Sequence, residues 1–423
     1  MQSVRRILRI RSPFRYRGTD TDGGADQQRG DGTGRSRAVA VECGPQPRRG
    51  TRPPARRQLR GSWKHSISRE NSMRYTTFGR RTGLRVSQYA LGTGNFGTGW
   101  GAGAEPGEAR RMFDRFAEAG GNFLDTADEY QFGESETLLG QFLGAERDDF
   151  VVATKFTNGA APQSGLSRTG NSRKNMRHSV EASLRRLGTD YIDLLWVHFP
   201  DGLTPVEEIL RGLDDLVGQG KILHAALSNF PAWRVSRAAT LADLKNWAPV
   251  AGIQVEYSLV ERTADRELLP MAESLGLGTA LWSPLGGGLL TGKYRGSAEG
   301  RLSDLKTLVH TESSDQKTAI VDAVLAVAQE TGAPPAQVSV AWINERAARA
   351  TTSRIPIVGP RTLGQLDDYL GALDVVLTPE QYTRLCDVSA VPLGVPHEAS
   401  AGVRDRVQGG DASLFATPAV PVA

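Results

Sequence analysis

Four residues able to move a proton or stabilise a charge stand at the end of, or shortly after, three short apolar runs. They are Asp125 and Tyr130 with the first run, Lys155 with the second and His198 with the third. Singly, each has an ordinary explanation: an Asp that caps a helix, a half-buried loop Tyr, a surface Lys or a core His. Together, a carboxylate, a phenol, an ammonium group and an imidazole are the groups that acid-assisted reduction of a carbonyl needs.

The elements that must position these residues alternate between short apolar runs and helical patterns, such as the apolar spacing within residues 109–116. Eight runs are predicted as strands: 90–92, 122–125, 150–154, 192–197, 222–228, 252–256, 277–282 and 355–358. Repeated strand and helix predicts a parallel sheet, and eight such units predict an α/β fold of the (β/α)8 or TIM-barrel type. An open doubly wound sheet would also alternate, but it gives no reason for catalytic candidates to follow strands two, three and four. In a barrel, all strands end on one face, where these residues can converge.

Two further features complete the predicted barrel. Residues 74–78 and 84–86, joined by a turn through Gly79 and Gly83, are predicted as an N-terminal β-hairpin that closes the barrel floor. The stretches 284–316 and 335–350, between strands seven and eight, are predicted as insertions over the C-terminal, active face.

A glycine pattern after the first strand needs a separate interpretation. Gly92, Gly94 and Gly97 are spaced as in the dinucleotide fingerprint, which requires a helix opening at the glycines and an acidic residue about 20 residues on, at the end of a second strand. Here the helix is predicted to begin near Pro106, and the residue at that distance is Asp114, inside the helix. The pattern therefore does not favour a Rossmann dehydrogenase.

Residues 1–72 differ in composition from the rest of the chain. They hold 17 basic and six acidic residues, so residues 73–423 carry a net charge of −7 although the whole chain carries +4. Rich in Arg, Gly and Pro, this extension cannot bury enough apolar surface to fold and is predicted to be disordered. A nucleic-acid arm and an organelle transit peptide are alternatives, but Asp residues interrupt the segment and a transit peptide should lack acids. The interpretation we favour is a start assigned too early, with Met73 as the true first residue.

Composition narrows the class of protein. The 423 residues are 39% apolar and 23% charged, as in ordinary globular chains. No apolar run approaches the roughly 20 residues that a membrane span needs, and the basicity belongs to the extension, so neither a membrane nor nucleic acid is predicted as a partner of the folded part. Cys43 and Cys386 lie far apart, which predicts no disulfide framework and a reducing, cytoplasmic location. The six His and two Cys show no metal-ligand spacing, so no metal site is predicted.

Motifs around the four candidates resemble the aldo-keto reductase family. They are Asp125-Thr126-Ala127-Asp128-x-Tyr130 with Gly133-x-Ser135-Glu136, then Lys155, then His198-Phe199-Pro200-Asp201. The resemblance covers residues 74 to about 390. It implies one reductase barrel over residues 73–390, followed by a partly disordered C-terminal segment at 391–423. It also implies reduction of aldehydes or ketones to alcohols with NADPH, and with NADH more weakly, on a small-molecule carbonyl substrate by a monomer or weak homo-oligomer.

The proposed chemistry assigns a role to each of the four residues. Hydride reaching the carbonyl carbon leaves negative charge on oxygen, so Tyr130 is assigned as the proton donor. A free phenol titrates near pH 10, and Lys155, kept charged by Asp125, is expected to bring the pKa of Tyr130 toward the working range. His198 is expected to orient the carbonyl and stabilise the developing oxyanion.

Strand ends five to eight supply the cofactor candidates. Ser228, Asn229 and Gln254 offer hydrogen bonds to an amide, and Trp282 offers a flat ring for a nicotinamide. The turn from the last strand into a helix presents backbone N–H groups, and Arg361 presents a guanidinium, to a phosphate. The resemblance extends the set of cofactor-binding residues to Thr93, Gly94, Asp125, Ser228, Asn229, Gln254, Trp282, Ser283, Pro284, Leu285, Lys293, Arg301, Gly359, Arg361, Gln365 and Asp368. Tyr369 departs from the family, which usually has Asn beside the adenine.

One stretch suggests a branch of the family and an alternative function. Residues 282–294 resemble the reductases related to potassium-channel β subunits, which bind the nucleotide and act chiefly as partners. A nucleotide-binding regulatory subunit with little turnover is therefore the alternative. His198 argues against it, because those subunits have another residue at that position.

Overall fold

The computed structural model describes residues 73–295, 310–416 and 418–420. The extension predicted to be disordered, residues 1–72, and the cofactor candidate Arg301 lie outside the described residues. The description begins at Met73, whose side chain is buried and whose backbone N–H donates to the carbonyl of Ala119.

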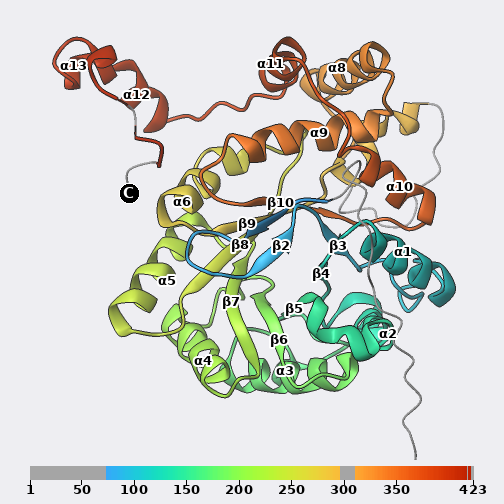
Figure 1. Cartoon of the computed structure of the whole chain (residues 1–423). Helices are drawn as coiled ribbons and strands as arrows, with labels where there is room; N and C mark the ends of the chain where they lie inside the picture. Colours follow the sequence, from blue (N-terminus) through green and yellow to red (C-terminus); the bar gives the residue numbers. More distant parts are fainter. Residues whose placement is uncertain (1–72, 296–309, 417, 421–423) are drawn as a thin grey trace, which may run out of the picture. The chain divides into compact units, whose positions relative to one another are not determined.

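Eight parallel strands close into a barrel in the order β10-β3-β4-β5-β6-β7-β8-β9 (Figure 1). Their bounds are β3 (Ala90–Gly92), β4 (Phe123–Asp125), β5 (Val151–Phe156), β6 (Ile192–Val197), β7 (Ile222–Ser228), β8 (Val250–Glu256), β9 (Gly278–Trp282) and β10 (Arg354–Val358). Each strand overlaps one of the eight predicted runs, so the predicted (β/α)8 barrel is confirmed. The strands are buried along almost their whole length, as expected for a parallel sheet covered by helices.

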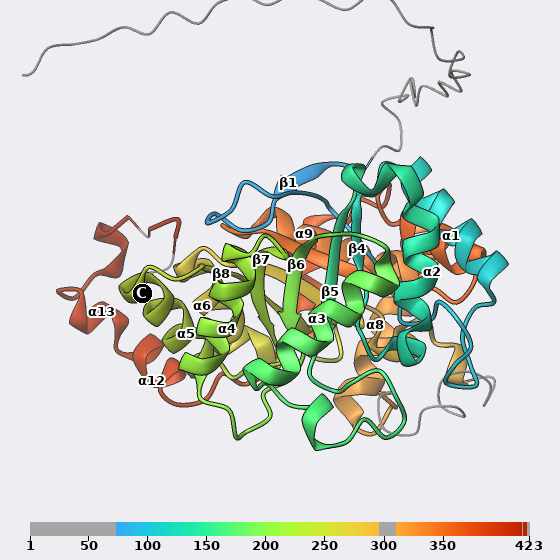
Figure 2. The ribbon, with the colours of Figure 1, turned by 90° about the horizontal axis from the view of Figure 1, so that it is seen from below.

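Helices surround the barrel (Figures 1 and 2). They are α1 (Pro106–Glu118), α2 (Glu134–Leu143), α3 (Arg173–Leu187), α4 (Val206–Gly218), α5 (Ala232–Lys245), α6 (Leu268–Leu275), α8 (Asp315–Thr331), α9 (Pro335–Ala348), α10 (Leu363–Gly371) and α11 (Pro379–Val388). Two short helices of the C-terminal segment, α12 (His397–Gly402) and α13 (Arg404–Val407), extend away from the barrel in Figure 1. Helix α1 illustrates how the sequence forms the helices that surround the barrel. It has Pro106 in its first turn, and its buried face consists of Ala109, Met112, Phe113 and Phe116.

The prediction for residues 335–350 is wrong. This stretch is helix α9, which packs against β10 and α10 and is the barrel helix that precedes the eighth strand. Its residues from Val338 to Ile343 are all buried, so it lacks the exposed polar face by which a surface helix is recognised in a sequence. The additional helix between β9 and β10 is α8. The predicted insertion 284–316 is described only in part and contains the short turns Gly286–Thr291 and Lys293–Arg295.

The predicted N-terminal hairpin is confirmed. Strands β1 (Tyr75–Thr77) and β2 (Arg85–Ser87) pair antiparallel, and Figure 2 shows the hairpin at one end of the barrel. Phe78, which follows β1, is fully buried and makes edge contacts with the rings of Phe123 and Trp196, at centroid distances of 5.7 and 6.0 Å. A Cβ added at Gly252 of β8 would lie 2.5 Å from Phe78 Cε1, so that glycine makes room for the ring. The hairpin therefore closes the barrel interior.

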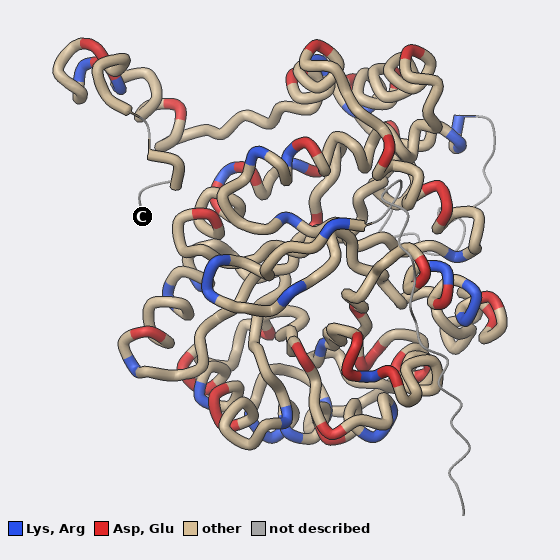
Figure 3. Tube along the Cα trace, in the orientation of Figure 1, with Lys and Arg blue, Asp and Glu red and all other residues tan. Residues whose placement is uncertain are grey.

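Charged residues of both signs are interspersed along the outer helices (Figure 3). No helix in the described ranges is long and apolar enough to cross a membrane. Nor do the described residues contain a group of three or more His, Cys, Asp or Glu that could hold a metal ion.

If Phe78 closes the barrel interior, Phe78→Ala should lower the free energy of unfolding by about 3–5 kcal/mol, because a large buried ring leaves a cavity. Urea unfolding followed by circular dichroism measures this. Leu244→Ala is the control, since Leu244 is 73% exposed and its truncation should cost less than about 0.5 kcal/mol. A loss below about 1 kcal/mol for Phe78→Ala would mean that the ring does not stabilise the barrel.

Candidate active site

The structure brings the four catalytic candidates together at the carboxyl ends of neighbouring strands. Asp125 is the last residue of β4, Lys155 lies near the end of β5, His198 follows β6, and Tyr130 begins the short helix η1 (Tyr130–Gly133). Lys155 Nζ lies 2.6 Å from Asp125 Oδ2 and 3.1 Å from Tyr130 Oη. The ring centroids of Tyr130 and His198 are 6.1 Å apart.

Lys155 is fully buried and has three hydrogen-bond acceptors for its three N–H groups. These are the Asp125 carboxylate, the Tyr130 hydroxyl and the backbone carbonyl of Thr126, at 2.8 Å. Burial lowers the pKa of Lys155, but the electrostatic effects of Asp125 and Tyr130 and the hydrogen bonds to both together outweigh burial and raise it above the usual value. Lys155 is therefore an ammonium ion at neutral pH.

Lys155 lowers the pKa of Tyr130, as expected, but the pKa as a whole lies above its usual value. Burial raises the pKa of the phenol, and the charge of Lys155 opposes the rise without cancelling it. Tyr130 therefore keeps its proton at neutral pH, as a proton donor must.

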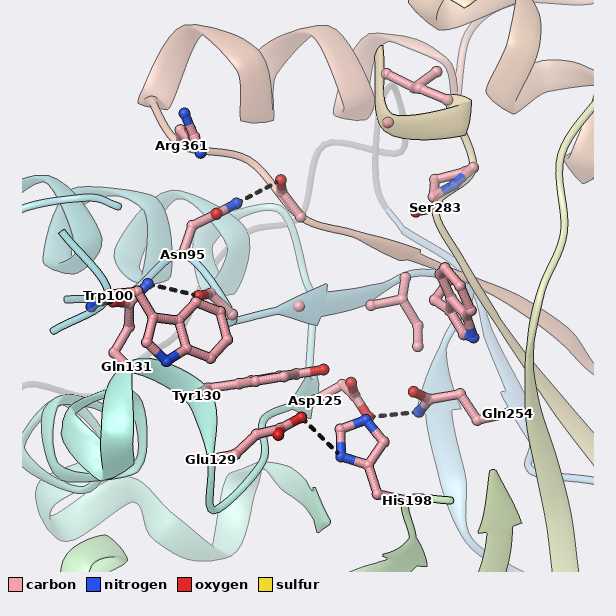
Figure 4. A pocket seen from close by; sticks show the side chains of 18 of the residues that line it. Asn95, Trp100, Asp125, Glu129, Tyr130, Gln131, His198, Gln254, Ser283 and Arg361 are labelled. Atoms are coloured by element: carbon pink, nitrogen blue, oxygen red, sulfur yellow. Dashed lines mark hydrogen bonds and ion pairs between the residues drawn. The ribbon is translucent and has the colours of Figure 1, made fainter. Parts of the chain in front are cut away.

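His198 is a neutral imidazole. Burial, helped by the positive charge of Lys155, holds the pKa of His198 well below its usual value. Its Nδ1 lies 3.3 Å from Oε1 of Glu129, and its ring stacks on Phe199 at a centroid distance of 4.7 Å (Figure 4). Neither Glu129 nor Phe199 was among the predicted site residues.

Amide side chains link the strand ends. Gln254 of β8 donates from Nε2 to Asp125 Oδ1 at 2.8 Å, so both carboxylate oxygens of Asp125 are engaged (Figure 4). Asn229, which follows β7 with φ +58°, donates to the carbonyl of His198 at 3.1 Å and accepts from Trp282 Nε1 at 3.2 Å. Three predicted cofactor residues thus also organise the catalytic group.

Gln131, the residue after Tyr130, holds a glycine-rich loop over the site. Its Nε2 donates to the carbonyls of Gly94 and Ala102, and its Oε1 accepts from the backbone N–H of Trp100 (Figure 4). Trp100 then makes an edge contact with the Tyr130 ring, at 5.9 Å between centroids. The loop thereby supplies an aromatic wall beside the phenol.

A cavity of about 700 Å³ connects the catalytic group to the start of α10. The predicted site residues that line it are Gly94, Asp125, Tyr130, His198, Asn229, Gln254, Trp282, Ser283, Pro284, Leu285, Gly359 and Arg361. Those that do not line it are Thr93, Lys155, Ser228, Lys293, Gln365 and Asp368. Lining residues that the sequence analysis missed include Asn95, Trp100, Glu129, Gln131, Asn158 and Phe199. Glu129 and Phe199 are next to predicted site residues in the sequence, and this position could have identified them. Trp100 and Asn158 lie in loops, where no periodic pattern could identify them.

The far end of the cavity is suited to a phosphate. Asn95 donates to the carbonyls of Gly359 and Pro360, which fixes the loop before α10. Within that loop, the backbone N–H of Arg361 donates to Gln365 Oε1 at 2.8 Å. Arg361 and Tyr369 both line the cavity here. With amides and an indole at one end and a guanidinium beside a helix N-terminus at the other, the residues present fit a nicotinamide dinucleotide.

A buried carboxyl lies behind the catalytic group. Asp128 is 1% exposed, and within the described part of the chain its Oδ1 has no hydrogen-bond partner. Burial, together with the negative charges of Glu136 and Glu129, raises the pKa of Asp128 to about 8. Asp128 is therefore mostly protonated at neutral pH.

Comparisons with known proteins agree with this fold. A family model described as "Aldo/keto reductase family" matches residues 89–390. The norsolorinic acid reductase of Aspergillus flavus is 36% identical over 326 residues, covering 74% of this chain and 80% of that protein. The aryl-alcohol dehydrogenase [NADP(+)] of Phanerodontia chrysosporium is 36% identical over 337 residues, covering 74% and 86%. The uncharacterized oxidoreductase YrpG of Bacillus subtilis is 35% identical over 338 residues, covering 78% and 100%.

The chain belongs to the aldo/keto reductase family. It is an NAD(P)H-dependent oxidoreductase, as the sequence analysis predicted.

The buried Asp128 predicts a pH dependence of stability. The folded protein keeps a proton on Asp128 up to about pH 8, whereas the unfolded chain releases it near pH 4. The free energy of unfolding should therefore fall as pH rises through that interval, by on the order of 1 kcal/mol per pH unit from this group. Asp128→Asn should remove this slope in urea unfolding measured across the interval. The exposed Asp190→Asn is the control, and the same slope in both variants would contradict the assignment.

Proposed function

We propose that this protein reduces aldehydes or ketones to alcohols with hydride from NADPH, and that Tyr130 is the proton donor. The observation that carries the proposal is the contact of Lys155 Nζ with both Asp125 and Tyr130, beside the cavity that Tyr130 and His198 line. A protonated phenol that contacts a fixed cation can act as a general acid and donate its proton to a carbonyl oxygen.

In this mechanism the cofactor supplies the hydride. As negative charge develops on the substrate oxygen, the Tyr130 hydroxyl donates its proton to that oxygen. The ammonium of Lys155 then stabilises the phenolate that is left, and Asp125 keeps Lys155 charged and in place. His198, a neutral imidazole that lines the cavity, orients the carbonyl and donates a hydrogen bond to the developing oxyanion.

The cofactor residues are part of the proposal. Asn229, Gln254 and Trp282 would hold the nicotinamide, with Thr93, Gly94, Ser228 and the Ser283–Pro284–Leu285 turn around it. Lys293 would contact the pyrophosphate. Arg361 would grip the adenosine 2′-phosphate, with Gln365 holding the Arg361 backbone and Asp368 nearby on α10. The lining position of Arg361 and the NADP(+) in the name of one relative support NADPH as the preferred cofactor.

The proposed substrates are aromatic carbonyl compounds. Trp100, Tyr130 and Phe199 line the cavity, and flat rings pack well against aromatic walls. The name of the aryl-alcohol dehydrogenase points the same way. We also propose that residues 73–390 form the catalytic domain and that the enzyme is cytoplasmic and monomeric or weakly associated.

The proposed placement within the family is the branch related to potassium-channel β subunits, on the resemblance of residues 282–294. That placement supplies the competing function, a nucleotide-binding regulatory subunit. Oxidation of NADPH with 4-nitrobenzaldehyde separates the two. Turnover supports the reductase, whereas nucleotide binding without turnover across many carbonyl compounds would favour the regulatory subunit.

Tyr130→Phe removes the hydroxyl and keeps the ring, so NADPH affinity should survive while kcat falls by at least about 10²-fold, the scale of a lost general acid. Lys155→Met should reproduce much of that loss in kcat. The loss in the double variant should be far smaller than the product of the two single-variant losses, because the two residues act as one unit. Stopped-flow and steady-state kinetics measure both. Tyr75→Phe, which loses a hydroxyl outside the cavity, should keep normal turnover. Near-normal kcat in a folded Tyr130→Phe variant would transfer the acid role to His198.

Arg361→Ala should weaken NADPH binding by roughly 1.5–3 kcal/mol, the value of a charge-assisted contact. NADH binding should hardly change, because NADH lacks the 2′-phosphate. Dissociation constants from fluorescence titration test this, with the exposed Arg384→Ala on α11 as the control. If the binding of NADPH and of NADH weakens equally, Arg361 contacts a part of the cofactor that both nucleotides share, and not the 2′-phosphate.

A further inference from the structure

The charged side chains that line the described cavity are few. They are Asp125, Glu129 and Arg361. Asp125 is neutralised by Lys155 at 2.6 Å, and Arg361 belongs to the loop before α10, at the phosphate end. Of these three, Glu129 is therefore the carboxylate that can act on a substrate bound near Tyr130 and His198.

Among the described residues, Glu129 forms no ion pair with a Lys or Arg side chain. Its side chain is 24% exposed and turns toward His198, which is neutral (Figure 4). The nearby cation, Lys155, has its three N–H groups occupied by Asp125, Thr126 and Tyr130. Burial raises the pKa of Glu129 above its usual value, and a hydrogen bond from Asn158 and the charge of Lys155 oppose the rise without cancelling it.

We propose that Glu129 is a specificity-determining residue that excludes negatively charged substrates, so that the enzyme takes neutral or cationic aromatic carbonyl compounds. This inference rests on the proposed reductase function. A carbonyl placed to receive the Tyr130 proton lies beside His198, and Glu129 contacts His198 at 3.3 Å and directly precedes Tyr130 in the chain. An acidic group on the same small ring is therefore held close to the carboxylate, where partial burial strengthens the repulsion.

The test compares two aldehydes of nearly the same shape, 4-nitrobenzaldehyde, which is neutral, and 4-carboxybenzaldehyde, which is an anion. Their intrinsic reactivities differ, but that difference cancels when the ratio of their kcat/KM values is compared between variants. Glu129→Gln keeps the size and removes the charge, and it should shift the ratio toward the anion by on the order of 10-fold or more. Glu129→Asp keeps the charge and should keep the wild-type ratio.

Two controls isolate the charge of this residue. Glu118→Gln removes the same charge from an exposed position on α1 and should leave the ratio unchanged. Within the pH range in which 4-carboxybenzaldehyde stays ionised, the discrimination of the wild type against the anion should weaken as pH falls and Glu129 is protonated, whereas the Glu129→Gln variant should show no such change.

The outcomes are distinguishable. A Glu129→Gln variant that changes both aldehydes by the same factor would overturn the inference and make Glu129 a positioning residue for His198. No turnover of these aldehydes or of many other carbonyl compounds by the wild type would overturn the proposed function itself, and the inference with it.

Discussion

The buried ion pair of Lys155 and Asp125 is the interaction on which the site depends. An ammonium group removed from water is costly unless it is paired and fully hydrogen-bonded. Here the three acceptors around Nζ come from β4 and the turn after it, and Gln254 of β8 holds the other oxygen of Asp125. Removal of one partner would leave an uncompensated buried charge, at about 3–5 kcal/mol. The ion pair of Lys155 and Asp125 thus joins these strand ends and also holds the Tyr130 hydroxyl at the cavity.

The sequence was sufficient to predict the barrel and the convergence of the four catalytic candidates, and insufficient to predict the other residues that line the cavity. Short apolar runs ending in Asp125, Lys155 and His198 are local signals, and barrel topology converts strand ends into neighbours. Trp100 reaches Tyr130 only because Gln131 binds three backbone groups of a distant loop, which no periodicity encodes. Helix α9 was misassigned for the opposite reason. It is so deeply buried that its pattern lacks a polar face.

The pKa of Tyr130 shows the same limit in electrostatic terms. The sequence supplied the cation, Lys155, and therefore a reason for the pKa to fall. It could not supply the burial, which is a property of the whole fold and exceeds the effect of the cation. The consequence suits the proposed chemistry, because a phenol that remains protonated until charge builds on the substrate oxygen donates when the reaction needs it. Lys155 then acts mainly on the phenolate that forms.

Three carboxyl groups within five residues are in three different states, set by their surroundings. Asp125 is paired with Lys155, whereas Asp128 is mostly protonated, because burial outweighs the charge of Arg186. Glu129 is the one that faces the cavity without a matching charge. All three carboxyl groups lie in the short stretch between the end of β4 and Tyr130. The local sequence therefore does not distinguish their protonation states, which depend on the tertiary surroundings of each side chain. Lys155 donates its three N–H groups to other acceptors, and in our proposal the substrate therefore interacts with the carboxylate of Glu129.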